Sequence, residues 1–169
     1  MSLSLRIGIV CYPSYGGSGV VATELGKQLA RRGHSVHFIS YDLPFLLREE
    51  SHEVYYHAVD LPSYPVFPAQ PYMLSLTNKI VEVARYHNLD LLHVHYAIPH
   101  ATAAYLAKQI IGASRPKIIT TLHGTDITLV GSSPAFRDVI AFSIQKSDGV
   151  TAVSQDLAQQ TRRFFNIDR

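Results

Sequence analysis

Short apolar runs of β-type residues alternate with segments of helical periodicity along the whole chain of 169 residues. Apolar runs of strand length are typical of parallel strands buried on both faces, and the helices between them would cover those faces. We therefore expect one α/β domain with a doubly wound, mostly parallel, Rossmann-like sheet. The expected strands are residues 5–11, 35–40, 89–95, 117–122 and 149–153, and the expected helices are residues 20–32, 72–87, 101–111, 134–146 and a last one capped by Ser154 that reaches about residue 165.

Composition narrows the classes of partner. The chain is 47% hydrophobic and 17% charged, as expected of one compact domain with a core. A formal net charge of +2 without a basic block gives no reason to expect nucleic acid or a membrane surface as a partner, so we expect a small molecule. The single cysteine, Cys11, excludes an internal disulfide framework, and no secretory leader precedes the first strand. We therefore expect a cytoplasmic protein.

The pattern weakens between Asp42 and Gln70. Residues 54–59 are compatible with a short strand, and prolines at positions 62, 65 and 68 force an extended path there. We expect this part of the chain to be a mobile or wrapping segment.

A polar strand end follows Ile118 and Ile119. The run Thr120–Asp126 (TTLHGTD) places His123 beside a glycine that lets another group approach. Ligands of open parallel sheets bind outside the carboxyl ends of the strands, so this run is a candidate site. The alternative is a turn in which Asp126 caps the following segment and His123 has no role.

A second candidate is the glycine-rich stretch before the first helix. Gly17–Ala22 fits the dinucleotide-binding pattern G-x-G-x-x-A, and Asp42 stands where a ribose-binding acid would be. However, residues 12–16 separate Gly17 from the first strand, whereas that fingerprint turns directly off its strand. The remaining hypothesis is a helix N-terminus whose bare N–H groups hold phosphate or carboxylate. A turn that binds nothing is the alternative.

The sequence lacks two common motifs of nucleotide-binding proteins and hydrolases, and its histidines raise the question of a metal site. The sequence contains no P-loop, and Val20 breaks the pattern of a nucleophile elbow, so Ser18 is interpreted as a hydrogen-bond donor. Histidines at positions 93, 95, 100 and 123, with Cys11, suggest a metal site, but strand-end histidines more often bond the backbone or line a cleft. We expect no metal.

Several motifs together resemble the N-terminal domain of a family-4, GT-B-fold retaining glycosyltransferase. They are Gly16–Gly19 (GGSG), His93–Tyr96 (HVHY), Thr121–Asp126 (TLHGTD) and Thr151–Ser154 (TAVS). The resemblance covers the whole chain. The longer runs Tyr12–Leu25 and His123–Thr128 are most similar to the members that act in bacillithiol biosynthesis.

The resemblance implies an activity and a set of partners. Such an enzyme transfers N-acetylglucosamine from UDP-N-acetylglucosamine to L-malate, or to another small anionic acceptor, with retention at the anomeric carbon. It implies neither a cofactor nor a metal, and it allows a homodimer. The family's second domain carries the donor pocket, so we expect residues 1–169 to be the acceptor-binding half, inactive when isolated.

The resemblance also assigns roles to individual residues. It places Gly16, Gly17 and Ser18 against the donor phosphate or an acceptor carboxylate, and Tyr96, Thr121 and Thr125 in the acceptor pocket. His123 is the expected catalytic residue, in contact with the donor sugar, and Asp126 is expected to orient the loop. Two rival functions stay open: an NAD-binding domain of an oxidoreductase, and a non-catalytic module that binds small anions.

Overall fold

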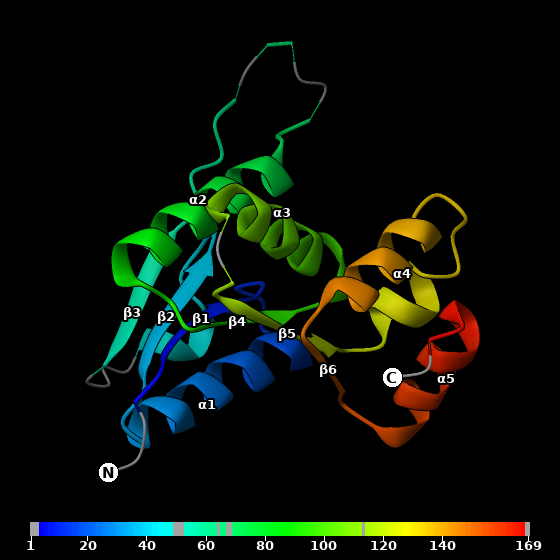
Figure 1. Ribbon diagram of the computed structural model, residues 1–169, viewed down its shortest axis with the longest axis horizontal. Helices are drawn as coiled ribbons and strands as arrows, with labels where there is room; N and C mark the ends of the chain where they lie inside the picture. Colours follow the sequence, from blue (N-terminus) through cyan, green and yellow to red (C-terminus); the bar gives the residue numbers. More distant parts are fainter. Residues whose placement is uncertain (1–3, 49–52, 64, 67–68, 113, 168–169) are drawn as a thin grey trace.

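A single parallel sheet of six strands forms the centre of the computed structural model, which describes residues 4–48, 53–63, 65–66, 69–112 and 114–167 (Figure 1). The strand order is β3-β2-β1-β4-β5-β6, and every neighbouring pair is parallel. The strands are β1 (Arg6–Val10), β2 (Ser35–Ser40), β3 (Val54–Ala58), β4 (Leu91–His95), β5 (Lys117–Leu122) and β6 (Gly149–Ala152). The expected doubly wound, Rossmann-like α/β class is confirmed.

The helices fill the connections between these strands. They are α1 (Gly17–Arg31), α2 (Tyr72–His87), α3 (Thr102–Ile111), α4 (Arg137–Lys146) and α5 (Gln155–Phe165), with short helical turns η1 (Phe45–Arg48), η2 (Ala97–Ala101) and η3 (Thr125–Leu129). Ser154 caps α5 as expected, since its Oγ accepts the Leu157 N–H at 3.1 Å. The preceding helix, α4, begins at Arg137 rather than at the expected Pro134, because residues 134–136 form a turn.

The expected start of the first helix at Val20 was wrong. Helix α1 begins at Gly17, so the glycines form its first turn instead of a preceding loop. Glycine has a low helix propensity, which favours a loop from the sequence alone. The structure overrides this preference because the Ser14 carbonyl lies where a Cβ on Gly19 would be, so a glycine is needed for the chain to turn into the helix here.

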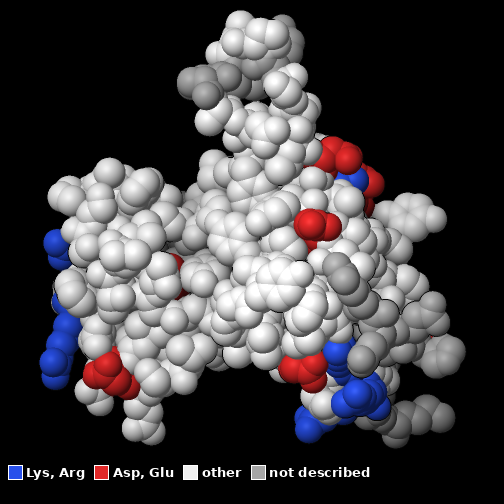
Figure 2. Space-filling view, turned by 180° about the vertical axis from the view of Figure 1, so that it is seen from behind, with Lys and Arg blue, Asp and Glu red and all other residues white. Residues whose placement is uncertain are grey.

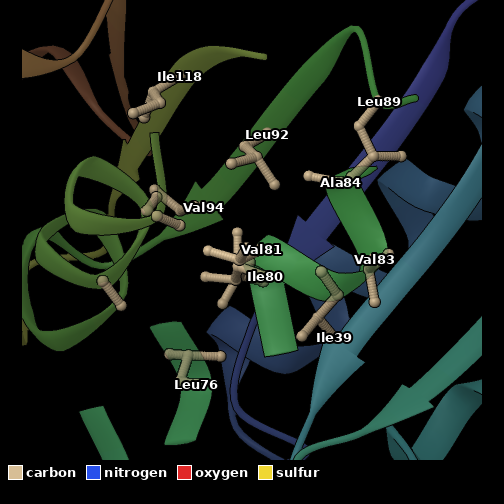
Figure 3. Packing of buried hydrophobic residues seen from close by; sticks show 14 of the residues in the cluster. Ile39, Leu76, Ile80, Val81, Val83, Ala84, Leu89, Leu92, Val94 and Ile118 are labelled. Carbon is tan, nitrogen blue, oxygen red and sulfur yellow. The ribbon is translucent and has the colours of Figure 1, made fainter. Parts of the chain in front are cut away.

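Apolar side chains pack on both faces of the sheet. On one face, Leu76 and Ile80 of α2 meet Leu92 of β4 in the cluster shown in Figure 3. On the other face, the ring of Phe38 lies against Gly26 of α1 and leaves no room for a side chain there. Successive strand residues therefore point to opposite helix layers.

Part of the weakly patterned segment 42–70 is described. It contains η1 and the edge strand β3, so the short strand expected at residues 54–59 is confirmed. Residues 49–52, 64 and 67–68, which include the third proline, lie outside the described residues.

The strand order changes direction between β1 and β4, and we call the region outside the carboxyl ends of these two strands the crevice. Chain connections from these two neighbouring strands lead to opposite faces of the sheet, with α1 on one side and α3 on the other (Figure 1). A doubly wound sheet binds its ligands at such a switch point. Residues that follow β1, β4 and β5 are therefore the candidates for a site.

Ion pairs gather at the opposite, amino-terminal edge of the sheet. The Asp90 carboxylate accepts hydrogen bonds from Arg6 Nε at 3.0 Å and from Arg115 Nη1 at 2.7 Å. The hydrogen bond from Arg6 is the main reason why the pKa of Asp90 falls to about 2. These contacts join the starts of β1, β4 and β5 away from the crevice.

Candidate functional site

The first turn of α1 opens into the crevice. Gly16 is the N-cap in an extended conformation, and no side chain caps the helix. Gly17 is exposed and Ser18 is half-buried, and the space beside Gly17 is open, with no atom within 4 Å of a Cβ built there. Unpaired N–H groups at the positive end of a helix attract anions. The three residues expected in an anion-binding loop thus lie at a helix N-terminus that a ligand can approach.

Tyr96 closes the crevice from the end of β4. Its hydroxyl donates a hydrogen bond to Ser18 Oγ at 3.0 Å, and its N–H donates to the Thr121 carbonyl at 3.0 Å. Its φ of 85° and ψ of 137° lie in a region that side chains larger than glycine rarely adopt. Strained backbone of this kind clusters at functional sites.

Two histidines meet between the neighbouring ends of β4 and β5. His95 Nδ1 lies 2.8 Å from His123 Nε2, and the two rings stack with their centroids 5.1 Å apart. His95 is fully buried, and its Nε2 has no hydrogen-bond partner among the described residues. Burial, together with the neighbouring histidines, lowers the pKa of His95 far below its usual value, and burial also lowers the pKa of His123. Both rings are therefore neutral at pH 7.

Asp126 holds the loop that carries His123. One carboxylate oxygen accepts the N–H groups of His123 at 3.2 Å and Gly124 at 3.0 Å, and the other accepts the Ala97 N–H at 3.0 Å. The residue is only 2% exposed. Asp126 thus joins the backbone after β5 to the backbone after β4.

Thr121 lies below the crevice rather than in it. Its hydroxyl has two partners already, His93 Nε2 and the Thr151 hydroxyl, each at 2.7 Å. The residue is buried at 7% exposure. Thr121 therefore supports the site from within the sheet, through this hydrogen-bond chain and through its carbonyl bond to Tyr96.

A cavity of about 540 Å³ adjoins the crevice on the side of η2 and η3. Tyr96, Thr125 and Asp126 line it, whereas the first turn of α1, Thr121 and His123 do not. The remaining lining residues are Tyr12, Met73, Ile98, Pro99, Thr102, Val130, Phe136 and Val139. The residues expected at the site thus surround Tyr96 in two groups, one in the cavity and one in the crevice.

The sequence reasoning missed the aromatic support behind this site. Tyr12 follows β1 and Cys11, and its ring centroid lies 4.4 Å from that of His100. The fully buried His100 bonds the His95 carbonyl through Nδ1 and the Tyr72 hydroxyl through Nε2. The sequence signal that could have revealed this support is the density of tyrosines and histidines after strand ends.

The strand-end histidines do not form a metal centre in this geometry. Their ring nitrogens are not among the ligand atoms that converge in the described part of the chain, and His93, His95 and His100 each bond a neighbour within the site. Burial raises the pKa of Cys11 to about 12, so its thiol stays protonated and is a poor ligand. The convergent metal-ligand trio among the described residues is a different one, His37, His57 and His87.

On the face shown in Figure 2, Lys and Arg lie at the left margin, at the lower right and beside acidic side chains at the upper right, and mostly uncharged residues cover the middle. None of the helices in the described part of the chain is long and apolar enough to cross a membrane.

Comparison with known proteins connects this geometry to a family. Residues 15–169 match the model of Glycosyltransferase Family 4. The chain is 59% identical, over 99% of its length, to N-acetyl-alpha-D-glucosaminyl L-malate synthase of Bacillus anthracis, and covers 44% of that protein. It is 27% identical, over 89% of its length, to an uncharacterized glycosyltransferase of Methanocaldococcus jannaschii, and covers 40% of it.

The fold has solved counterparts. A glycosyltransferase from Rickettsia africae superposes with a TM-score of 0.71 at 22% identity, over 98% of this chain and 41% of that one. The chain spans less than half the length of the curated relatives that it matches.

Proposed function

The chain belongs to glycosyltransferase family 4, and from this premise we propose that it is the acceptor-binding half of an enzyme that transfers N-acetylglucosamine from UDP-N-acetylglucosamine to L-malate. The identity of 59% to a malate synthase across 99% of the chain carries the choice of substrates. The donor-binding half is expected outside these residues, as the relatives are more than twice as long. The isolated chain should accordingly bind acceptor without turnover.

The acceptor is proposed to sit in the crevice between α1 and Tyr96. Malate carries two carboxylates, and the first turn of α1 offers N–H groups and positive dipole charge to one of them. Ser18 and Tyr96 add hydroxyl groups beside that turn. Thr125 lines the adjoining cavity, whereas Thr121 is proposed to shape the floor of the site, because its hydroxyl is occupied.

His123 is proposed to contact the donor sugar through Nδ1. Its Nε2 faces His95 Nδ1, and the other nitrogen of His95 is buried without a partner. A buried acceptor without a partner is tolerated more readily than a buried N–H without one. We therefore assign the His95 proton to Nδ1, which donates to His123 Nε2 and leaves the His123 proton on Nδ1. A neutral donor then faces the site.

The mechanism that fits these residues relies on position and fixed dipoles. The acceptor hydroxyl and the anomeric carbon must be held together, and the leaving diphosphate must be stabilised. The described residues supply the acceptor side through α1 and Tyr96, and one neutral hydrogen-bond donor through His123. Asp126 keeps that donor in place by fixing the loop backbone.

Calorimetric titration of the chain tests the acceptor assignment. We expect L-malate to bind, succinate, which lacks the acceptor hydroxyl, to bind as well, and NAD not to bind. A protein that carries both halves should form the malate glycoside with retained anomeric configuration, which NMR detects. NAD binding in the crevice would support the oxidoreductase alternative and contradict the proposal.

A further inference from the structure

Three histidines from separate elements converge on the α2 side of the sheet. His37 lies in β2, His57 in the edge strand β3 and His87 at the end of α2. One ligand nitrogen from each lies within 4.8 Å of the other two. Two strands, β1 and β2, separate β3 from β4, so this cluster is distinct from the histidines at the ends of β4 and β5.

His37 and His57 are hydrogen-bonded to each other, and a hydroxyl lies behind His37. His37 Nδ1 lies 3.0 Å from His57 Nε2, while His37 Nε2 lies 3.1 Å from the Ser35 hydroxyl. When His37 donates its Nε2 proton to Ser35, its Nδ1 lone pair points into the cluster. A second hydrogen bond that fixes the tautomer and ring orientation is typical of metal-binding histidines.

The distances suit a small transition-metal ion. With zinc–nitrogen bonds of about 2.0–2.1 Å, tetrahedral geometry places ligand nitrogens roughly 3.3 Å apart. The 3.0 Å between His37 Nδ1 and His57 Nε2 is near that value, and the ligand nitrogens of the cluster lie within 4.8 Å of one another, so closing the site takes a side-chain shift of up to about 1.5 Å. His87 is the last residue of α2 and half-buried, so rotation of its side chain can supply this shift.

The surroundings leave room for a fourth ligand. A cavity of about 240 Å³ opens at His57 and His87, and the carboxylate-bearing Glu82 lies on its wall. Glu82 is paired with Lys79 at 2.9 Å, and both charges act on His57. Burial, and then the neighbouring histidines, lowers the pKa of His37 to about 4, so this ring presents a neutral nitrogen at pH 7.

We propose that His37, His57 and His87 form a binding site for a divalent transition metal of the zinc class, with water in the fourth position. Imidazole ligands favour zinc, copper and nickel over magnesium and calcium. Before the ion binds, His57 Nε2 donates its proton to His37 Nδ1. When the ion binds, this proton moves to His57 Nδ1, so the ring stays neutral and no net proton is lost. The ion links the edge strand β3 to β2 and to α2, which predicts a stabilising role.

Metal titration of the tag-free chain tests the site. After chelator treatment we expect one equivalent of Zn²⁺ to bind and raise the Tm, Co²⁺ to give the visible absorption of a four-coordinate ion, and Mg²⁺ to do neither. His57→Gln and His87→Gln should each weaken Zn²⁺ binding by at least about 10-fold to 100-fold. His34→Gln is the matched control, since His34 bonds the Leu5 N–H outside the cluster and its loss should leave Zn²⁺ binding unchanged.

Two further measurements keep the proposal falsifiable. In the unaltered chain, ring nitrogen NMR signals of the three histidines should change with Zn²⁺, which requires no variant to fold. Zn²⁺ titration of the His123→Gln variant distinguishes binding at the His37, His57 and His87 cluster from binding at the histidines that follow β4 and β5. Zn²⁺ binding that is lost in His123→Gln but kept in His57→Gln and His87→Gln would overturn the proposal, and so would the absence of binding.

Discussion

The Tyr96 hydroxyl donates to Ser18 Oγ at 3.0 Å and so joins two residues that lie 78 positions apart in the chain. The bond crosses the crevice between β4 and the first turn of α1. It fixes the phenol beside the helix N-terminus where we propose that the acceptor binds. The same tyrosine is held by its N–H to Thr121 and by ring contact with His123, so it connects the anion-binding turn to the proposed catalytic residue.

This connection predicts coupling between the two hydroxyls. Tyr96→Phe and Ser18→Ala should each lower the free energy of unfolding by about 0.5–1.5 kcal/mol, the usual net value of a hydrogen bond. The double variant should cost less than the sum of the two, because both single changes remove one bond. Urea unfolding of the four proteins gives the coupling energy, and strictly additive losses would show that the bond contributes nothing.

Two glycines in the same turn should respond in opposite ways. Gly17 has open space beside it, so Gly17→Val should fold and lose affinity for malate or phosphate, because the side chain blocks the approach to the helix N-terminus. Ligand affinity of the unaltered chain should also fall with salt. Gly19→Ala should instead destabilise the fold, since its Cβ meets the Ser14 carbonyl. Calorimetry and thermal unfolding distinguish the two effects, and unchanged anion affinity in a folded Gly17→Val would rule out this binding turn.

Asp126 is predicted to act through the backbone rather than on substrate. Asp126→Asn keeps the shape but replaces one acceptor oxygen with an N–H donor, which leaves a buried backbone N–H without a partner. We expect a loss of about 1–3 kcal/mol in the free energy of unfolding and weaker malate binding from the loosened loop. Amide NMR shifts at His123 and Gly124 report the loop directly. Unchanged shifts and stability would mean that the three N–H bonds do not orient it.

The ion pairs of Asp90 at the amino-terminal edge of the sheet predict that the fold loses stability in acid. The pKa of Asp90 is lowered to about 2 by the hydrogen bond from Arg6, below the ordinary value of 3.8. A lowered pKa in the folded state gives stability that is full above the unfolded value and is lost as the pH falls through the folded value. Asp90→Asn should therefore lower the free energy of unfolding by roughly 1 kcal/mol at pH 7, a modest value because the arginine partners are partly exposed and screened. Near pH 2 the substitution should change it little, because much of Asp90 is already protonated there. Unfolding curves at both pH values check this difference.

The sequence was sufficient for the strands and insufficient for their pairing. Short runs rich in β-branched and aromatic residues located β2 and β5 to the residue, because such side chains favour strands. The same runs do not reveal that His95 is the register partner of Thr121, which is what brings His95 to His123. Register depends on contacts between distant segments. The His37, His57 and His87 cluster escaped the sequence reasoning for the same reason, since three separate elements supply it.

The last prediction concerns His123, which lies half-buried at the crevice with Nε2 bonded to His95. In a protein that carries both halves, His123→Ala should lower kcat by about 10²-fold to 10³-fold, the usual loss for one preorganised hydrogen-bond donor at a reacting centre. The Tm should fall as well, because the buried His95 Nδ1–H loses its acceptor, while Asp126 keeps the loop backbone in place. A histidine needed only for packing would differ in its activity: its removal would cost the same stability, about 1–3 kcal/mol, and spare the activity of the folded fraction. His34→Ala, which removes a histidine outside the crevice, is the control for general effects. If kcat stays near normal while the Tm falls, measured on one preparation, His123 belongs to the support of the site and not to its chemistry.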